Sequence, residues 1–151
     1  MEIELRQIRH EDRPMLQCWM DQSYVSQIYG GSGPWLEELY GGEFGFIRCF
    51  VAEAEGKPVG FGQYYDCNLG GESWYEAPLP GQLYSMGFFV ANAQMLRQGI
   101  GTALCQALID HIRANTTCQK ILMQAKTLAA AATLKRCGFE KQGEIYSKIL
   151  G

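Results

Sequence analysis

The feature that most restricts the fold is an apolar strand followed by a short loop and a helix that opens on two glycines. Leu83 to Val90 is an apolar run typical of a buried strand, and apolar residues recur at helical spacing from Ile100 to Ile112. Between them lies Gly99-Ile100-Gly101. Glycine lets the backbone approach a ligand closely, and the free amides and dipole of a helix start favour an anion such as pyrophosphate. The pattern therefore predicts a phosphate-binding turn in an α/β domain.

Other glycine motifs fit this segment poorly. A dinucleotide fingerprint requires a third glycine where Leu104 stands, and a P-loop requires Gly-Lys followed by Ser or Thr. Close packing of the loop against the helix start remains an alternative explanation for Gly99 and Gly101.

Turn signals and periodicity predict ten elements in the order βααβββαβαβ, a mixed α/β sheet with helices on its faces in one domain of residues 1–151. The predicted strands are Ile3 to Ile8, Phe46 to Ala54, Val59 to Tyr65, Leu83 to Val90, Lys120 to Met123 and Ile145 to Leu150. The predicted helices are Pro14 to Met20, Pro34 to Leu39, Ile100 to Ile112, and a helix capped by Thr127 that runs through Arg136 to a left-handed Gly138. Glu55-Gly56-Lys57 predicts a hairpin, and the long segment from Asp66 to Gly81 is a candidate irregular substrate lid.

Composition narrows the classes of partner. The 151 residues include 47% hydrophobic and 19% charged residues, which is typical of a globular domain. The net charge is −3, and the sequence contains no basic stripe. We therefore expect no nucleic-acid partner and a mild preference for a cationic small molecule. We also expect a cytoplasmic protein without a membrane segment, and six reduced cysteines without disulfides, because the cysteines are scattered and lack CxxC spacing.

The element order and the glycine turn resemble the GNAT superfamily of acetyl-CoA-dependent N-acetyltransferases over nearly the whole chain. The family signature is Gln/Arg-x-x-Gly-x-Gly/Ala; Leu96 holds its first position here, and Arg97 lies one residue later. Within the superfamily, the chain looks most similar to the aminoglycoside 6'-N-acetyltransferase branch. The resemblance implies a GNAT-like acyl-CoA N-acyltransferase fold. The segments that carry this resemblance are Leu16-x-x-Trp19 to Tyr29-Gly30-Gly31, Pro58-Val59-Gly60-Phe61-Gly62-Gln63-x-Tyr65, Gly71-Glu72-x-Trp74-Tyr75-Glu76, Ala91-Asn92-Ala93 to Gly99-Ile100-Gly101-Thr102, and Cys137-Gly138-Phe139-Glu140-Lys141-Gln142-Gly143.

The resemblance implies an acetyl-CoA site. It implies that the strand ending at Phe88-Phe89-Val90 splays from its neighbour, which frees backbone groups for the pantetheine arm and an amide near Val90 for the developing oxyanion. The residues expected to bind acetyl-CoA are Phe89, Val90, Arg97, Gln98, Gly99, Ile100, Gly101, Thr102, Thr127 and Ala131.

The expected catalytic apparatus departs from the family pattern. Gly87 stands where the branch usually has an acid on the fourth strand, and Leu134 stands where many members have a tyrosine that protonates the thiolate. Glu72 is the remaining candidate base, and Ser85 lies on the same strand face as Gly87. The residues expected to surround an amine are Tyr29, Tyr65, Asp66, Trp74 and Glu76.

These departures leave three functional hypotheses open. The first is an acetyltransferase acting on a primary amine of a small polar, aminoglycoside-like molecule through a ternary complex. The second is an acetyltransferase of peptide or protein amines, and the third is a coenzyme A-binding regulatory or sensor domain with little catalysis.

His10 and His111 have no partner pattern, and we expect no metal. The family commonly has a second C-terminal strand, so we expect that strand to be absent or supplied by another subunit of a homodimer; otherwise the protein is a monomer.

Overall fold

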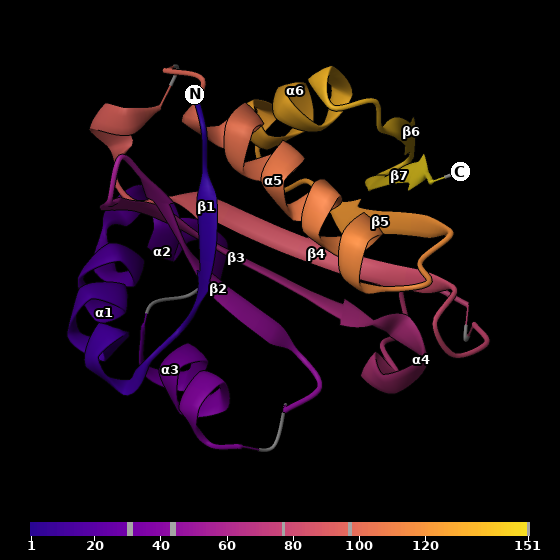
Figure 1. Cartoon of the computed structure of the whole chain (residues 1–151), viewed down its shortest axis with the longest axis horizontal. Helices are drawn as coiled ribbons and strands as arrows, with labels where there is room; N and C mark the ends of the chain where they lie inside the picture. The colour runs from indigo at the N-terminus through magenta and orange to yellow at the C-terminus, as the bar shows by residue number, and fades with distance from the viewer. Residues whose placement is uncertain (30–31, 43–44, 77, 97, 151) are drawn as a thin grey trace.

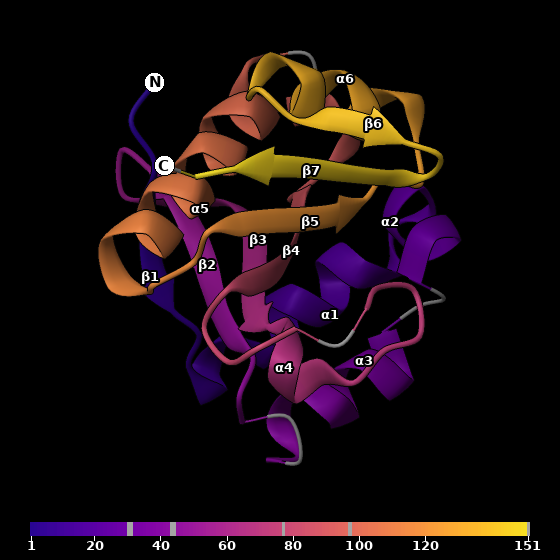
Figure 2. The same cartoon turned by 90° about the vertical axis from the view of Figure 1, so that its right-hand side faces the viewer.

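The computed structural model describes residues 1–29, 32–42, 45–76, 78–96 and 98–150, and for residues 27–29 and 32–35 it describes the backbone alone. Within these ranges the chain forms one mixed sheet with helices on both faces (Figure 1, Figure 2). The strands are β1 (Glu4–Gln7), β2 (Arg48–Ala54), β3 (Lys57–Asp66), β4 (Leu83–Val90), β5 (Lys120–Gln124), β6 (Glu140–Gln142) and β7 (Ile145–Ile149). The helices are α1 (Arg13–Asp21), α2 (Ser23–Tyr29), α3 (Ser32–Tyr40), α4 (Cys67–Gly70), α5 (Ile100–Asn115) and α6 (Leu128–Arg136), with short 3-10 turns η1 (His10–Asp12) and η2 (Ala93–Met95). The predicted α/β class is confirmed.

The sheet has the strand order β1-β2-β3-β4-β5-β7-β6. Neighbouring strands are antiparallel except for β4 and β5, which run parallel. The β2–β3 hairpin closes through Glu55 and Gly56 with φ values of 52° and 77°, the paired positive values that a two-residue hairpin turn requires. The hairpin predicted at Glu55-Gly56-Lys57 is confirmed.

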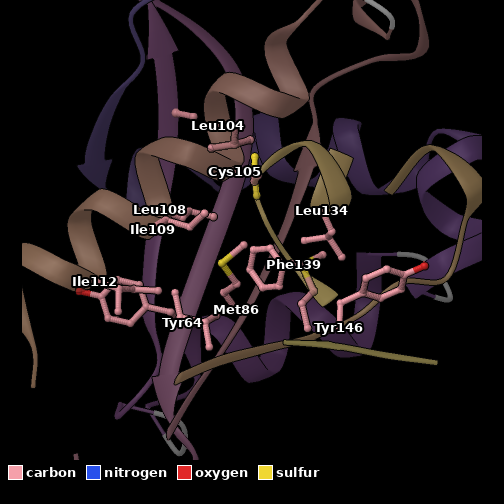
Figure 3. Close-up of a cluster of buried hydrophobic side chains, with 14 of the residues drawn as sticks. Tyr64, Met86, Leu104, Cys105, Leu108, Ile109, Ile112, Leu134, Phe139 and Tyr146 are labelled. Carbon is pink, nitrogen blue, oxygen red and sulfur yellow. The ribbon is translucent and has the colours of Figure 1, made fainter. Parts of the chain in front are cut away.

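The two faces of β3 pack against different helices. On one face Phe61 joins a cluster beneath α1 and α3, whose other buried members are Leu16, Met20, Val25, Leu36, Cys49 and Phe89. On the other face Gly62 lies under α5, where a Cβ would come within 2.9 Å of both Leu108 methyl carbons. Glycine therefore allows α5 to approach the sheet, and Figure 3 shows the core that forms there around Leu104, Leu108 and Tyr64. Packing on both faces holds the middle of the sheet in place.

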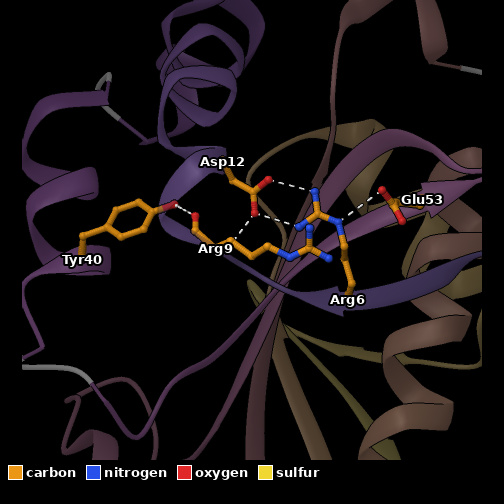
Figure 4. Close-up of polar contacts among 5 residues, drawn as sticks. All are labelled: Arg6, Arg9, Asp12, Tyr40 and Glu53. Carbon is orange, nitrogen blue, oxygen red and sulfur yellow. Dashed lines mark hydrogen bonds and ion pairs between the residues drawn. The ribbon is translucent and has the colours of Figure 1, made fainter.

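A charged network joins the first strand to the helices on one face (Figure 4). Arg6 donates to both carboxylate oxygens of Asp12 at 2.8 Å and to Glu53 at 3.2 Å. Asp12 also accepts the Arg9 amide at 2.7 Å, and Tyr40 at the end of α3 donates to the Arg9 carbonyl at 2.8 Å. The Arg6 guanidinium lowers the pKa of Asp12, so the carboxylate stays ionised. The network therefore ties α3 to the edge of the sheet.

Two helices, α2 and α4, were missed by sequence reasoning. Where a single second helix was predicted, the structure has both α2 and α3, and the segment predicted as an irregular lid begins with the short helix α4. Asp66 caps α4, because its carboxylate accepts the Asn68 amide. Leu83 to Val90 and the helix that begins at Ile100 were placed correctly.

The expectation of an absent or borrowed last strand is wrong. The segment predicted as the final strand is β7, which inserts between β5 and the missed strand β6 and pairs with both. β6 has three exposed residues, so its hydrophobic pattern gave no strand signal. No helix in the described part of the chain is long and apolar enough to cross a membrane.

Candidate active site

The site begins where β4 and β5 separate. Their parallel pairing covers only three positions and ends at Ser85 and Leu122, although β4 continues to Val90. On the other side of β4, the Ala91 amide donates to the Val59 carbonyl at 2.7 Å. Because amide directions alternate along an antiparallel pair, the amides of Phe88 and Val90 point away from β3 and toward the gap left by β5. The predicted splay is present, and it leaves donors on the open side of β4.

Helix α2 supports the end of β4. Tyr24 donates its hydroxyl proton to the Val90 carbonyl, and the Gln22 side chain, just before α2, donates to the Ala91 carbonyl. Burial raises the pKa of Tyr24 to about 12, so it remains a donor. The Val90 carbonyl is therefore bonded to Tyr24, and the Val90 amide, on the same edge of β4, is turned toward the splay.

Helix α5 begins beside this strand end. Gly99 is its N-cap with φ of 81°, and, its two chain neighbours aside, a Cβ placed there would meet no atom of the described residues within 4 Å. A Cβ at Gly101 would lie 3.8 Å from Val90 Cγ2, in ordinary contact. The first amides of α5 have no partner within the helix, which is the arrangement that binds an anion.

The other residues predicted to bind acetyl-CoA lie around this helix start in different roles. The Ile100 side chain is buried in the core, so only its backbone faces the open side, and the Gln98 side chain donates to the Gln94 carbonyl at 2.7 Å. Thr127 caps α6 by accepting the Ala130 amide at 3.1 Å, and Ala131 packs partly buried against the core. Thr102 is half-buried in the first turn of α5.

One predicted cofactor residue has another placement, and one lies outside the described residues. Phe89 turns into the cluster under α1 and stacks on Phe61 with ring centroids 5.5 Å apart. Arg97 lies outside the described residues, so its predicted contact stays a prediction.

Two cavities adjoin on the α1 and α3 face of the sheet. The cavity at the splay, here the β4 cavity, has a volume of 180 Å³. It is lined by Gln63, Tyr65, Glu72, Trp74, Ser85, Met86, Gly87, Phe88, Met123, Gln124, Lys126, Thr127 and Ala130. The second, here the α3 cavity, has a volume of 310 Å³ and is lined by Glu38, Leu39, Phe46, Ile47, Cys49, Gln63, Tyr65, Gly70 and Glu72. Gln63, Tyr65 and Glu72 belong to both, so they form a common wall.

Glu72 is held at this common wall by two aromatic residues. The Trp74 indole N–H donates to its carboxylate, and the Glu72 amide donates to the Tyr75 hydroxyl at 3.3 Å. The Trp74 and Tyr75 rings meet edge to face at 5.0 Å. The structure therefore brings the predicted base and Trp74 together at the cavity.

Ser85 and Tyr65 face each other across β3 and β4 within the β4 cavity. Ser85 is 5% exposed. Burial raises the pKa of the Tyr65 hydroxyl, although the neighbouring Ser85 partly opposes that shift, so Tyr65 is a neutral donor and acceptor. The two hydroxyls supply polar, uncharged groups next to Glu72.

Gly87 and Leu134 differ in their distance from the cavities. Gly87 lines the β4 cavity opposite Gln63, and among the described residues a Cβ there would meet Gln63 atoms alone, at 3.9 Å. Leu134 is fully buried in the core. Neither position supplies an acid or base.

Two of the remaining residues predicted to bind the amine, Asp66 and Glu76, line neither cavity. The Asp66 carboxylate accepts the amides of Asn68 and Gly81, at 3.0 and 2.8 Å, and so closes the 66–81 segment. Glu76 is exposed and lines neither cavity, and the side chain of Tyr29 lies outside the described part. Their predicted contacts with substrate stay predictions.

Sequence reasoning missed Gln63, which forms part of both cavities, and Glu38 on α3. Gln63 stood inside a recognised segment, but only strand pairing shows that it opposes Gly87. Glu38 gave no signal, because an acid on an exposed helix face is ordinary. Among the described residues, no group of three or more His, Cys, Asp or Glu that could hold a metal is present.

Comparison with known proteins decides the family. A family model of the acetyltransferase (GNAT) domain matches residues 9–147. The chain belongs to the GNAT acetyltransferase family. It is therefore an N-acetyltransferase by family, as the element order and glycine turn predicted.

Individual relatives agree with this assignment. The chain is 26% identical over 153 aligned positions to the aminoglycoside N(6')-acetyltransferases type 1 of Klebsiella pneumoniae and Serratia marcescens, covering 95% of this chain and 76% of each relative. A crystal structure of aminoglycoside acetyltransferase AAC(6')-Ib with coenzyme A superposes with a TM-score of 0.85 at 24% identity, over 98% of this chain and 95% of that one. A spermidine N-acetyltransferase chimera that includes the Vibrio cholerae enzyme superposes with a TM-score of 0.74 at 16% identity, over 99% and 96% of the two chains. The structural likenesses establish the fold.

Proposed function

We propose that this GNAT acetyltransferase transfers acetyl from acetyl-CoA to a primary amine of a small polar, aminoglycoside-like molecule, directly within a ternary complex. One observation carries the proposal. Where β4 separates from β5, its free amides lie next to a cavity whose wall contains Glu72. The proposed acetyl-CoA site and the proposed amine site thus adjoin, so direct transfer needs no covalent acetyl-enzyme intermediate.

The residues present fit coenzyme A. The Val90 side of the splay offers backbone amides for an extended amide-containing arm, in the manner of an added strand. Gly99 leaves open space before the first amides of α5, so a pyrophosphate can approach them closely. Bound there, acetyl-CoA supplies the acetyl group as a thioester, whose C–S bond breaks as the C–N bond to the amine forms.

Within this arrangement Glu72 accepts the proton that the amine loses. Its carboxylate is fixed by Trp74 at the edge of the β4 cavity, where positioning and proton removal act together. The Val90 amide donates to the oxygen that gains negative charge in the transition state. Ser85, beside the Tyr65 hydroxyl, supplies a neutral proton carrier in the same cavity.

The proton for the departing thiolate comes from water or one of these hydroxyls, since Leu134 replaces the usual tyrosine. A thiol has an ordinary pKa of about 8.5, so its thiolate is a workable leaving group near neutral pH.

The acceptor class rests on the relatives and on charge. The curated relatives are named as aminoglycoside N(6')-acetyltransferases, and another superposed structure is AAC(6')-Ib with ribostamycin and coenzyme A. The net charge of −3 and the carboxylates at the cavities suit a cationic acceptor. We further propose a cytoplasmic protein, which six free cysteines support, acting as a monomer or homodimer without nucleic-acid or membrane partners.

The decisive experiment incubates the protein with acetyl-CoA and a panel of amines while free thiol is measured. Thiol release that depends on the amine supports the proposal, and the amine-free reaction is the control. Tight coenzyme A binding without such release favours a sensor domain, the second candidate, which the absence of a side chain at Gly87 and the burial of Leu134 favour. Absence of coenzyme A binding and of ligand-dependent thermal stabilisation would leave only a packing role for the glycines.

A further inference from the structure

The α3 cavity extends the candidate acceptor site away from the splay. It shares Gln63, Tyr65 and Glu72 with the β4 cavity, so the two cavities adjoin, and the α3 cavity adds a further 310 Å³ next to the proposed position of the reacting amine. That volume is at the lower end of small-molecule pockets, about 300 to 1,000 Å³. The cavity is therefore large enough for a distal part of the acceptor.

Two polar groups in the wall of the α3 cavity, the Cys49 thiol and the Tyr65 hydroxyl, are kept uncharged by burial. Burial raises the pKa of the Cys49 thiol to about 12 and also raises the pKa of the Tyr65 hydroxyl, so both stay neutral. Leu39, Phe46 and Ile47 add apolar surface. Gly70 completes the wall, because a Cβ there would lie 2.5 Å from both the Tyr65 ring and the Tyr75 hydroxyl.

Only two of the nine residues that the structure shows lining this cavity are charged, Glu38 and Glu72, and both are acids. Glu72 is engaged by Trp74. In the described part of the chain, Glu38 takes part in none of the ion pairs, whereas the preceding residue Glu37 pairs with Arg13 at 3.0 Å. A cavity that combines the apolar side chains of Leu39, Phe46 and Ile47 with the Glu38 carboxylate suits a carbon chain that carries a cation.

We infer that the α3 cavity binds a second cationic group of the acceptor and that Glu38 determines this specificity, so the preferred acceptors are diamines or larger polyamines. This inference rests on the proposed acetyltransferase function. It assigns Glu38 to recognition of the distal ammonium and Glu72 to the reacting amine, and it predicts discrimination between amines of equal length by their second charge.

The test compares 1,6-diaminohexane with hexylamine, which has the same carbon chain and one ammonium group. In Glu38→Gln we expect KM for 1,6-diaminohexane to rise about threefold to fivefold, the upper part of the range for an exposed ion pair, with kcat and the KM for acetyl-CoA unchanged. The hexylamine KM, or its inhibition constant against 1,6-diaminohexane if turnover is slow, stays the same. Glu37→Gln is the matched control, because it removes the same charge one residue away and outside the cavity lining; it leaves both amines unaffected.

Two results overturn the inference while the proposed function stands. One is an equal change for both amines in Glu38→Gln, and the other is an equal effect of Glu37→Gln, which would show only a general charge effect. If the wild-type protein acetylates no amine in the panel, the proposed function fails first and the inference falls with it.

Discussion

Replacing Gly99 by glutamate tests the position of the coenzyme A site. Gly99 has φ of 81°, so any L-residue there costs about 1 to 2 kcal/mol of folding stability. Its chain neighbours aside, no atom of the described residues lies within 4 Å of a Cβ at this position, so no clash with them adds to that cost. Gly99→Gln therefore shares the backbone strain and nearly the same bulk, and the difference between the two variants isolates the charge.

The charge effect follows from Coulomb's law. A carboxylate about 6 Å from a pyrophosphate charge, in surroundings with an effective dielectric between 20 and 80, opposes it by about 0.7 to 3 kcal/mol. This corresponds to about 3-fold to 150-fold weaker binding of coenzyme A by Gly99→Glu than by Gly99→Gln. Isothermal titration calorimetry at two salt concentrations measures it, and salt should shrink the difference. Equal affinities of the two variants and the wild type would refute the placement of the phosphates at the α5 start.

Three further predictions concern catalysis and stability. Glu72→Gln should lower kcat about 100-fold with little change in the KM for acetyl-CoA, as steady-state thiol release will show; an unchanged kcat would remove Glu72 as the base. Burial and Arg48 lower the pKa of His111, so the folded state binds fewer protons just below pH 6.5 and the free energy of unfolding should fall as the pH drops through the lowered pKa. Urea unfolding between pH 7 and 5 measures this, and His111→Gln should flatten the dependence. Asp12→Asn should cost about 1 to 3 kcal/mol by breaking the paired contact with Arg6, and in the wild type that contribution is lost only as the pH falls below 3.8, through the lowered pKa of Asp12; a thermal melt matching the wild type at pH 7 would contradict it.

Much of the fold could be predicted because its signals are local. Leu83 to Val90 is a continuous apolar run, the β2–β3 hairpin carries a turn sequence, and Thr127 caps a helix through its own hydroxyl. The helices α2 and α4 were not predicted, because a short helix without strong periodicity is stabilised mainly by the residues that it packs against or that cap it. Tyr24 of α2 shows this, since its bond to Val90 depends on a strand 66 residues away.

The candidate site was predictable only in part for the same reason. The glycine turn and Glu72 stand in recognisable segments, but Asp66 in a neighbouring segment closes a loop through backbone amides. Local sequence does not distinguish an acid that binds a ligand from one that caps a helix, because both are polar residues in a glycine-rich segment. Their roles depend on which groups the folded chain brings to each carboxylate.

The sequence by itself determined the relative order of the ten predicted elements, without α2, α4 and β6, the glycine-opened start of α5 and the family to which they belong. Tertiary structure alone decided that β5 leaves β4 after Ser85, that Gln63 faces the vacant side-chain position at Gly87, and that two cavities meet at Glu72. The physical reason is the distance along the chain over which each interaction acts. Periodicity and capping act within a few residues, whereas strand pairing and cavity walls join residues far apart in the chain, whose proximity depends on the packing of the whole sheet.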